Sequence, residues 1–229
     1  MSQISTKTRR SPVAFALLAA ALFATASSFT AGIAKAEGLN AVTKSGVKVG
    51  RAIVDSNGDL VIAWATTIRP GMADFIRKAF AKYGRTARHV HLRIHSTGGS
   101  VMEGESVIQV LRKIRRTHRL RTYVPRAGKC YSMCVPIFLQ GKDRVAARSS
   151  VFLFHDVSRR HAKGGVSYDR EETVRLYQRY FVEAGVSIAW LNRVLPQIKQ
   201  ADFWQTGQEL ISSRTGIITH VLSNQTARR

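Results

Sequence analysis

The chain has 229 residues, of which 36 are Lys or Arg and 14 are Asp or Glu, so its formal net charge is +22 at pH 7. Hydrophobic residues make up 45% of the sequence and charged residues 22%, which excludes an intrinsically disordered chain and is typical of a globular protein. The length suits one large domain that can bury a core of its own. The positive charge favours anionic partners such as acidic polymers or membrane surfaces, with solubility alone as the other explanation.

Residues 1–36 are predicted to be an export signal. Three basic residues precede an apolar, uncharged run at 12–26, and Ala34-Lys35-Ala36 fits the small-residue pattern of a cleavage site. The run is too short to span a bilayer, which favours a cleaved signal over a membrane anchor. Because residues 1–36 hold four basic residues and no acidic one, the mature chain keeps 32 basic and 14 acidic residues, a net +18. We therefore expect a periplasmic or secreted protein.

A loose lead-in segment is expected at 37–47, followed by a single domain at 48–229. Ser56-Asn57-Gly58-Asp59 predicts a hairpin between two alternating runs. Strands are predicted at 49–55, 60–65, 89–94, 120–124, 151–155 and 216–222. Helices are predicted from Pro70 through Phe80 and at 101–117, 133–139, 168–184, 187–195 and 206–212, and a basic, Gly-rich loop at 156–166. Alternating strands and helices indicate an α/β fold with a largely parallel sheet.

Two glycine-containing turns, Gly98-Gly99-Ser100 and the segment Gly128 to Ser132, each join a predicted strand to a predicted helix. Ligands of parallel α/β sheets bind where such turns converge at the carboxyl ends of the strands. Glycines let the backbone approach a substrate and leave N–H groups free, and a serine at a helix start lies near the positive end of the helix dipole. These parts suit an oxyanion site, although two ordinary turns would have the same spacing.

Four segments carry a resemblance to one family. Ser96-Thr97-Gly98-Gly99-Ser100-Val101 resembles the Ser-Pro-Gly-Gly-Ser-Val turn of the Clp protease proteolytic subunit, with Thr97 in place of the proline. The segments Cys130–Cys134, Phe154–Asp156 and Asp202–Thr206 are similar to those that carry that family's nucleophile, catalytic histidine and acid. All four occur in family order. The chain thus resembles exported proteins of the Clp/crotonase superfamily that contain a Cys-x-Ser-x-Cys segment.

The resemblance implies an α/β fold of repeated β-β-α units and a serine hydrolase, most simply a peptidase. Ser132 would be the nucleophile, His155 its general base and Asp202 the group that orients the imidazole. The backbone N–H groups of Gly99 and Met133 would form the oxyanion hole. A peptide or protein substrate and a homo-oligomer are implied; no cofactor, metal or ATPase partner is.

The two cysteines flank Ser132, where the family has small residues. An oxidising compartment would favour a disulfide between Cys130 and Cys134, while a reduced thiol at a helix start could itself be reactive. Two cysteines alone cannot build a zinc site, and the alternating His89, His91 and His95 suit a half-exposed strand better than a metal site.

Alternatives remain for the function. An inactive hydrolase fold could serve as a binding protein for anionic polymers or a membrane surface, with the basic stretch at 112–121 as one contact. Crotonase-type thioester chemistry is a third hypothesis, disfavoured outside the cytoplasm. A serine–lysine dyad would need Lys129, Lys142 or Lys163 at the site, and Asp156 competes with Asp202 as the partner of the histidine.

Overall fold

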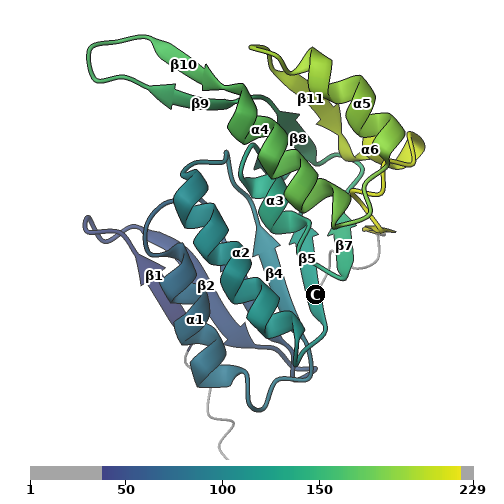
Figure 1. Ribbon diagram of the computed structural model, residues 1–229. Coiled ribbons are helices and arrows are strands. Elements are labelled where there is room, and N and C mark those ends of the chain that lie inside the picture. The colour runs from purple at the N-terminus through teal and green to yellow at the C-terminus, as the bar shows by residue number, and fades with distance from the viewer. Residues whose placement is uncertain (1–37, 223–229) are drawn as a thin grey trace, which may run out of the picture. The chain divides into compact units, whose positions relative to one another are not determined.

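The protein's structure, a computed structural model, describes residues 38–222 (Figure 1). The predicted export signal lies outside this range, as do residues 223–229. Among the described residues, the helices are all too short or too polar to cross a membrane.

A seven-stranded sheet forms the centre, with the strand order β1-β2-β3-β4-β5-β7-β12. Its strands are β1 (Leu39–Val42), β2 (Lys48–Val54), β3 (Leu60–Trp64), β4 (Val90–Ile94), β5 (Leu120–Val124), β7 (Asp143–Ala146) and β12 (His220–Val221). The first three strands pair antiparallel, and every pair from β3 to β12 is parallel. The carboxyl ends of the parallel strands therefore share one edge, where such sheets bind ligands.

Helices α1 (Met72–Tyr83) and α2 (Val101–Arg115) cover one face of this sheet (Figure 1). The sheet residues beneath them, such as Leu92 and Leu120, are fully buried. The hydroxyl of Ser100 accepts a hydrogen bond from the N–H of Glu103 at 3.2 Å and so caps α2 at its start. The cap fixes the helix directly after the Gly98-Gly99 turn.

A smaller sheet, ordered β11-β8-β6, is formed by β6 (Lys129–Tyr131), β8 (Val151–Phe154) and β11 (Phe203–Thr206). Strands β6 and β8 are parallel, and β11 runs antiparallel to β8. Phe154, the last residue of β8, packs its ring against those of Trp190 and Phe181, with centroid distances of 5.2 and 6.3 Å. The short helix α3 (Cys134–Phe138) follows β6 after a two-residue turn.

A hairpin and four helical segments complete the described chain. They are β9 (Val157–Arg160), β10 (Val166–Asp169), α4 (Arg170–Leu176), the π-helix η1 (Tyr177–Val182), α5 (Ile188–Gln197) and α6 (Gly207–Ser212). Ser187 caps α5 through the N–H of Trp190, and Thr206 and Glu209 form a capping box at α6.

The predicted α/β fold with a largely parallel sheet is confirmed, as is the Ser56–Asp59 hairpin. Some elements differ from expectation. The lead-in at 37–47 contains a strand, β1, and the expected loop at 156–166 is mostly the β9–β10 hairpin. The segment before Ser132 is strand β6, the helix expected at 168–184 begins at Arg170 and turns into η1, and the last strand is confined to β12. Strand β7 was not expected at all.

Candidate active site

Ser132 lies in the sharp turn between β6 and α3, with a φ of 53° that is unusual for a residue other than glycine. Its N–H donates to the carbonyl of Leu153 on β8 at 2.8 Å, and its carbonyl accepts from the N–H of Val135 at 2.9 Å. These bonds hold a backbone conformation that costs free energy by itself, which is common at functional sites. A strand-to-helix turn of this kind presents a serine hydroxyl at the end of a sheet.

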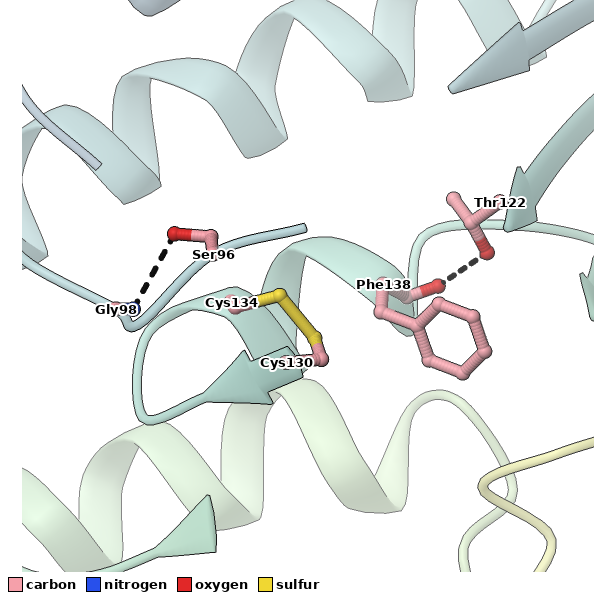
Figure 2. Close-up of a disulfide and its surroundings, with 6 residues drawn as sticks. All are labelled: Ser96, Gly98, Thr122, Cys130, Cys134 and Phe138. Carbon is pink, nitrogen blue, oxygen red and sulfur yellow. Dashed lines mark hydrogen bonds between the residues drawn. A yellow bond between two sulfur atoms is a disulfide. The ribbon is translucent and has the colours of Figure 1, made fainter. Parts of the chain in front are cut away.

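A disulfide closes around this turn. It joins Cys130 of β6 to Cys134, the first residue of α3, with the two Cα atoms 5.1 Å apart and both residues fully buried (Figure 2). Ser132 is the middle residue of the closed segment. The bond therefore ties the strand before the serine to the helix after it.

The Gly98-Gly99 turn lies against the Ser132 turn. Gly98 has a φ of 84°, and a Cβ atom there would lie 2.8 Å from the Cβ of Ser132. Gly99 has a φ of 144°, and a Cβ there would lie 2.1 Å from the carbonyl oxygen of Ile68. The buried Ser96 hydroxyl accepts from the N–H of Gly98 at 3.2 Å (Figure 2). Only glycine fits either position with this backbone.

Two backbone N–H groups next to Ser132, those of Gly99 and Met133, have no acceptor among the described residues. The N–H of Ile68 donates to the carbonyl of Gly98, and the carbonyl of Ile68 accepts from the N–H of Ser100. Because Gly99 lies between these two bonds in a parallel bridge, its own N–H is directed away from Ile68. Within residues 38–222, neither the N–H of Gly99 nor that of Met133 donates a hydrogen bond. Both residues line the same cavity as Ser132. Free donors in such a place can stabilise a developing oxyanion.

The cavity has a volume of about 360 Å³ and is lined by both Ser132 and His155. Its remaining wall is largely apolar. The apolar side chains that line it are Val101, Met133, Pro136, Phe154, Val157, Leu176, Tyr177 and Phe181. The arrangement combines a serine hydroxyl, an imidazole and an apolar surface, and a largely apolar cavity with a few polar groups is the general form of a small-ligand site.

The helix α4–η1 supplies part of that wall, which the sequence patterns did not reveal. Tyr177 and Phe181 are one turn apart and stack with ring centroids 4.2 Å apart. Burial raises the pKa of the Tyr177 phenol far above its usual range, so the hydroxyl keeps its proton. The aromatic pair at a spacing of four was visible in the sequence, but core packing explains such a pair equally well.

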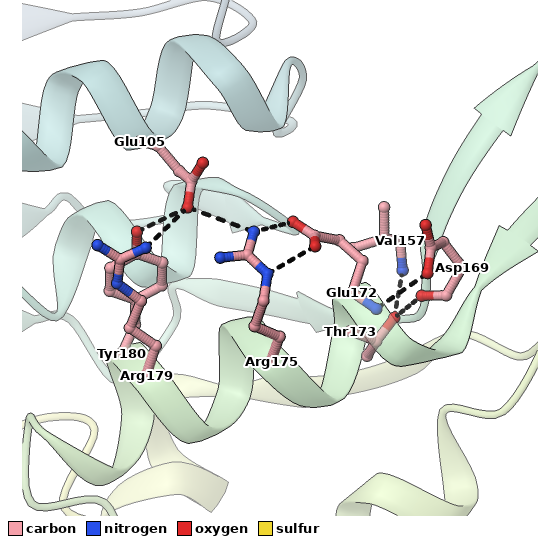
Figure 3. A network of polar contacts seen from close by, with 8 residues as sticks. All are labelled: Glu105, Val157, Asp169, Glu172, Thr173, Arg175, Arg179 and Tyr180. Atoms are coloured by element: carbon pink, nitrogen blue, oxygen red, sulfur yellow. Dashed lines mark hydrogen bonds and ion pairs between the residues drawn. The ribbon is translucent and has the colours of Figure 1, made fainter.

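Polar contacts fix this helix to its neighbours (Figure 3). Glu105 of α2 accepts from the Tyr180 hydroxyl at 2.9 Å and forms ion pairs with Arg179 at 3.5 Å and Arg175 at 3.6 Å. The Thr173 hydroxyl accepts from the N–H of Val157, two residues after His155, at 2.8 Å. The wall of the cavity is thus anchored both to α2 and to the strand that comes after the histidine.

His155 follows the last residue of β8 and is half-buried. On the neighbouring strand β11, Phe203 is the register partner of Phe154, the residue before His155. Asp202 directly precedes β11 and therefore lies at the strand end beside the histidine. Asp202 is exposed and does not line the cavity. In the described part of the chain, no hydrogen bond joins His155 to Ser132 or to Asp202. The structure therefore brings Ser132 and His155 to one cavity but leaves Asp202 outside it.

Asp156, the alternative partner of the histidine, points elsewhere. It is 1% exposed and accepts hydrogen bonds from Arg170 at 2.7 Å and from the N–H of Gln200 at 3.1 Å. Its carboxylate oxygens are therefore engaged away from the imidazole.

None of the lysines considered for a dyad, Lys129, Lys142 and Lys163, lines the cavity, and all three are exposed. Over residues 38–222, no group of three or more His, Cys, Asp or Glu side chains is arranged to hold a metal ion.

No protein-family model matches the sequence, and no curated protein matches it. Among solved structures, the chain is similar to a mutant ClpP1 from Listeria monocytogenes, with 18% sequence identity and a TM-score of 0.55. The match covers 72% of this chain and 92% of that one. The predicted Clp-type fold is thereby confirmed.

Proposed function

We propose that this chain is a serine hydrolase, a peptidase that acts through Ser132 and His155. One observation supports it above others: the two side chains line one cavity of about 360 Å³ together with the free N–H groups of Gly99 and Met133. Nucleophile, base and oxyanion donors are the parts that acyl transfer needs. The proposal places these groups near the carboxyl ends of the parallel strands, where parallel α/β sheets bind ligands.

In the proposed reaction, His155 takes the hydroxyl proton of Ser132 as the Oγ atom attacks the substrate carbonyl. The resulting oxyanion accepts hydrogen bonds from Gly99 and Met133. When the tetrahedral intermediate collapses, the C–N bond breaks and His155 gives its proton to the leaving amine. Water, deprotonated by the same imidazole, then hydrolyses the acyl-serine bond and restores the free hydroxyl.

Within residues 38–222 no hydrogen bond joins Ser132 to His155, although this reaction requires one. Such bonds are often long in unliganded enzymes and shorten when substrate binds. We propose that binding brings the imidazole to the hydroxyl and that Asp202 then orients the ring from the neighbouring strand end. The apolar wall suits a peptide with a hydrophobic side chain at the cleaved bond.

Export and assembly are part of the proposal. We propose that residues 1–36 direct the chain to the periplasm or the exterior and that the mature chain is a homo-oligomer, as the Clp resemblance implies. The reaction needs neither a metal nor an organic cofactor.

The test is covalent labelling of the purified chain with a fluorophosphonate probe, which reacts with activated serines. Ser132→Ala and His155→Ala should each abolish labelling, whereas Ser158→Ala, which removes another serine of the cavity wall, should not. Asp202→Asn should slow labelling by about 100-fold or more if the carboxylate fixes the imidazole tautomer. Circular dichroism establishes that each variant is folded.

A second function is favoured by the missing contacts among Ser132, His155 and Asp202. An inactive hydrolase fold that binds anionic polymers would show no labelling of the folded wild-type chain, and His155→Ala would leave its ligand binding intact. Labelling that persists in Ser132→Ala would also refute the hydrolase.

A further inference from the structure

A second cluster of polar side chains lies at the opposite ends of the parallel strands. His91 of β4 is the register partner of Arg121 of β5, and Arg121 is the partner of Asp143 of β7. His89 and Arg119 come two residues before His91 and Arg121, so their side chains point to the same face of the sheet. This is the face opposite to the one that α1 and α2 cover. The carboxyl ends of the same strands point toward the candidate active site.

These five residues line a cavity of about 270 Å³. None of them lines the candidate active site. The cluster is therefore a separate feature, and a ligand bound there would be independent of the proposed peptidase function.

Two side chains of the cavity, Arg121 and His89, have hydrogen-bonding nitrogen atoms that no group within residues 38–222 engages in a hydrogen bond. Arg119 donates from Nε and Nη2 to the two carboxylate oxygens of Asp143 at 2.6 and 2.7 Å, so each of these oxygens already accepts a hydrogen bond. The guanidinium of Arg121 lies 3.8 Å from Asp143 and makes no hydrogen bond within the described chain. The Nδ1 atom of His89 is buried and has no partner among the described residues. Unpaired buried polar groups cost free energy, which a ligand that supplies acceptors would recover.

Two carboxylates that do not line the cavity, Asp59 and Asp55, act on the His91 imidazole, in addition to the cavity residue Asp143. Asp59 approaches His91 with an oxygen–nitrogen distance of 3.5 Å, and Asp55 is close enough to influence the same imidazole. Burial, and next the charge of Arg121, lower the pKa of His91 in spite of these carboxylates. On the other side, His220 contributes to the field at Asp143. The guanidinium of Arg121, whose contact with Asp143 at 3.8 Å is an ion pair without a hydrogen bond, and the imidazole of His91 thus face the same cavity.

We propose that this cavity is a binding site for a phosphate group, held by Arg121 together with His89 and His91. Arginine matches phosphate oxygens with paired N–H donors, and imidazoles on the neighbouring strand can reach the remaining oxygens. A tetrahedral dianion offers acceptors to donors on both strands at once, which a planar carboxylate does less well. Arg119 stays paired with Asp143, so its Nε and Nη2 donors and its charge are already balanced by that carboxylate.

The first experiment titrates the chain with inorganic phosphate and follows binding by calorimetry and by the NMR signals of the histidine rings. Arg121→Ala should weaken binding by about tenfold, the effect of losing one charge-assisted contact. Arg93→Ala is the matched control, because Arg93 is an exposed arginine on the same sheet face that lies over the Tyr123 ring, 5.5 Å from its centroid. Arg93→Ala should leave the affinity unchanged. Equal losses in both variants, or no loss in Arg121→Ala, would overturn the site.

The pH dependence gives a second readout. Sulfate keeps its charge between pH 8 and pH 5, so any change in its affinity comes from the protein. A bound dianion favours the protonated imidazole of His91; therefore sulfate should bind more tightly as the pH falls, and His91→Gln should remove this trend. A trend that is identical in His91→Gln would contradict the role of this histidine.

Two further binding experiments decide whether the phosphate group belongs to a soluble ligand or to a lipid. Glycerol phosphate represents a soluble monoester, and vesicles that contain phosphatidic acid present the same group on a membrane, with phosphatidylcholine vesicles as the blank. Arg121-dependent binding of glycerol phosphate supports a soluble ligand. Arg121-dependent binding of the vesicles alone supports a lipid headgroup. Failure of both refutes the proposal, whatever the outcome of labelling at Ser132.

Discussion

Asp156, which directly follows the histidine of the candidate site, is buried and forms an ion pair with the half-buried Arg170. The Nη1 atom of Arg170 lies 2.7 Å from the Oδ1 atom of Asp156, and the Asp156 side chain is 1% exposed. The second carboxylate oxygen accepts from the N–H of Gln200 at 3.1 Å, and Arg170 also donates to the carbonyl of Leu195 at 2.7 Å. One carboxylate therefore connects the end of β8, the start of α4 and the turn that precedes Asp202.

We expect Arg170→Met to lower both the stability of the fold and the labelling rate of Ser132. Removing the cation leaves Asp156 buried without its charge partner, which costs about 3 kcal/mol in the free energy of unfolding. The double variant Asp156→Asn with Arg170→Met should recover part of that loss, because it removes the carboxylate that would otherwise be buried without a charge partner. Urea denaturation measures stability. A positioning role also predicts a changed pH profile of labelling in folded Arg170→Met; an unchanged profile would limit the pair to stability.

The disulfide gives a second prediction. Because Ser132 holds a φ of 53° inside the closed segment, we expect loss of the bond to let its turn relax. Replacing both cysteines by alanine should cost about 2 kcal/mol for so short a loop and slow probe labelling at Ser132. Treatment of the wild type with dithiothreitol should have the same effect on labelling, and treatment of the double variant should have none. Equal labelling rates in the wild type and the folded double variant would show that the turn holds its shape without the bond.

The Gly99 turn can be tested against a matched glycine. Gly99→Ala places a Cβ atom 2.1 Å from the Ile68 carbonyl, so the turn and its free N–H must shift. Gly71 also has a positive φ, 100°, but a Cβ there meets nothing within 4 Å. We expect Gly71→Ala to cost about 1 kcal/mol from backbone strain alone and to keep labelling, whereas Gly99→Ala should cost more and lose labelling. Similar behaviour of the two variants in thermal unfolding and labelling would count against a role of the Gly99 backbone.

Much of the fold was predictable because its elements follow hydrophobic periodicity. The alternation of Val90, Leu92 and Ile94 predicts a half-buried strand, and all three side chains are fully buried. Strand β7 could not be predicted from the sequence pattern, because it begins with Asp143 and Arg144, a charged pair that is typical of a loop. Arg144 is buried there and donates to carbonyls as distant in sequence as Ile217, which no local pattern can reveal.

The β9–β10 hairpin could not be predicted for a different reason. Its described side chains are mostly exposed, so no apolar face marks its strands, and Gly164 and Gly165 at its tip are typical of any loop. For the site, the motifs were sufficient to place Ser132 and His155 at one cavity. They could not indicate its aromatic wall or the missing contact with Asp202, because both depend on how α4–η1 and the turn before β11 pack.

The pair of Arg119 and Asp143 predicts a pH-dependent stability. The hydrogen bonds from Arg119 hold the pKa of the Asp143 carboxyl below its ordinary value although the side chain is 5% exposed. A pKa that is depressed in the folded state means that the stabilisation is complete above the unfolded pKa and is lost as the pH falls through the folded one.

We therefore expect Arg119→Gln to lower the free energy of unfolding at pH 7, because the Asp143 carboxylate then loses its two charge-assisted hydrogen bonds. The difference from the wild type should shrink below about pH 4, where the unfolded carboxyl takes up a proton. Arg121→Ala is the control, because its guanidinium lies 3.8 Å from Asp143 and should matter less. Urea denaturation from pH 7 to pH 3 measures both variants. A difference that stays constant over this range would mean that Arg119 stabilises the fold by packing and not through the charge of Asp143.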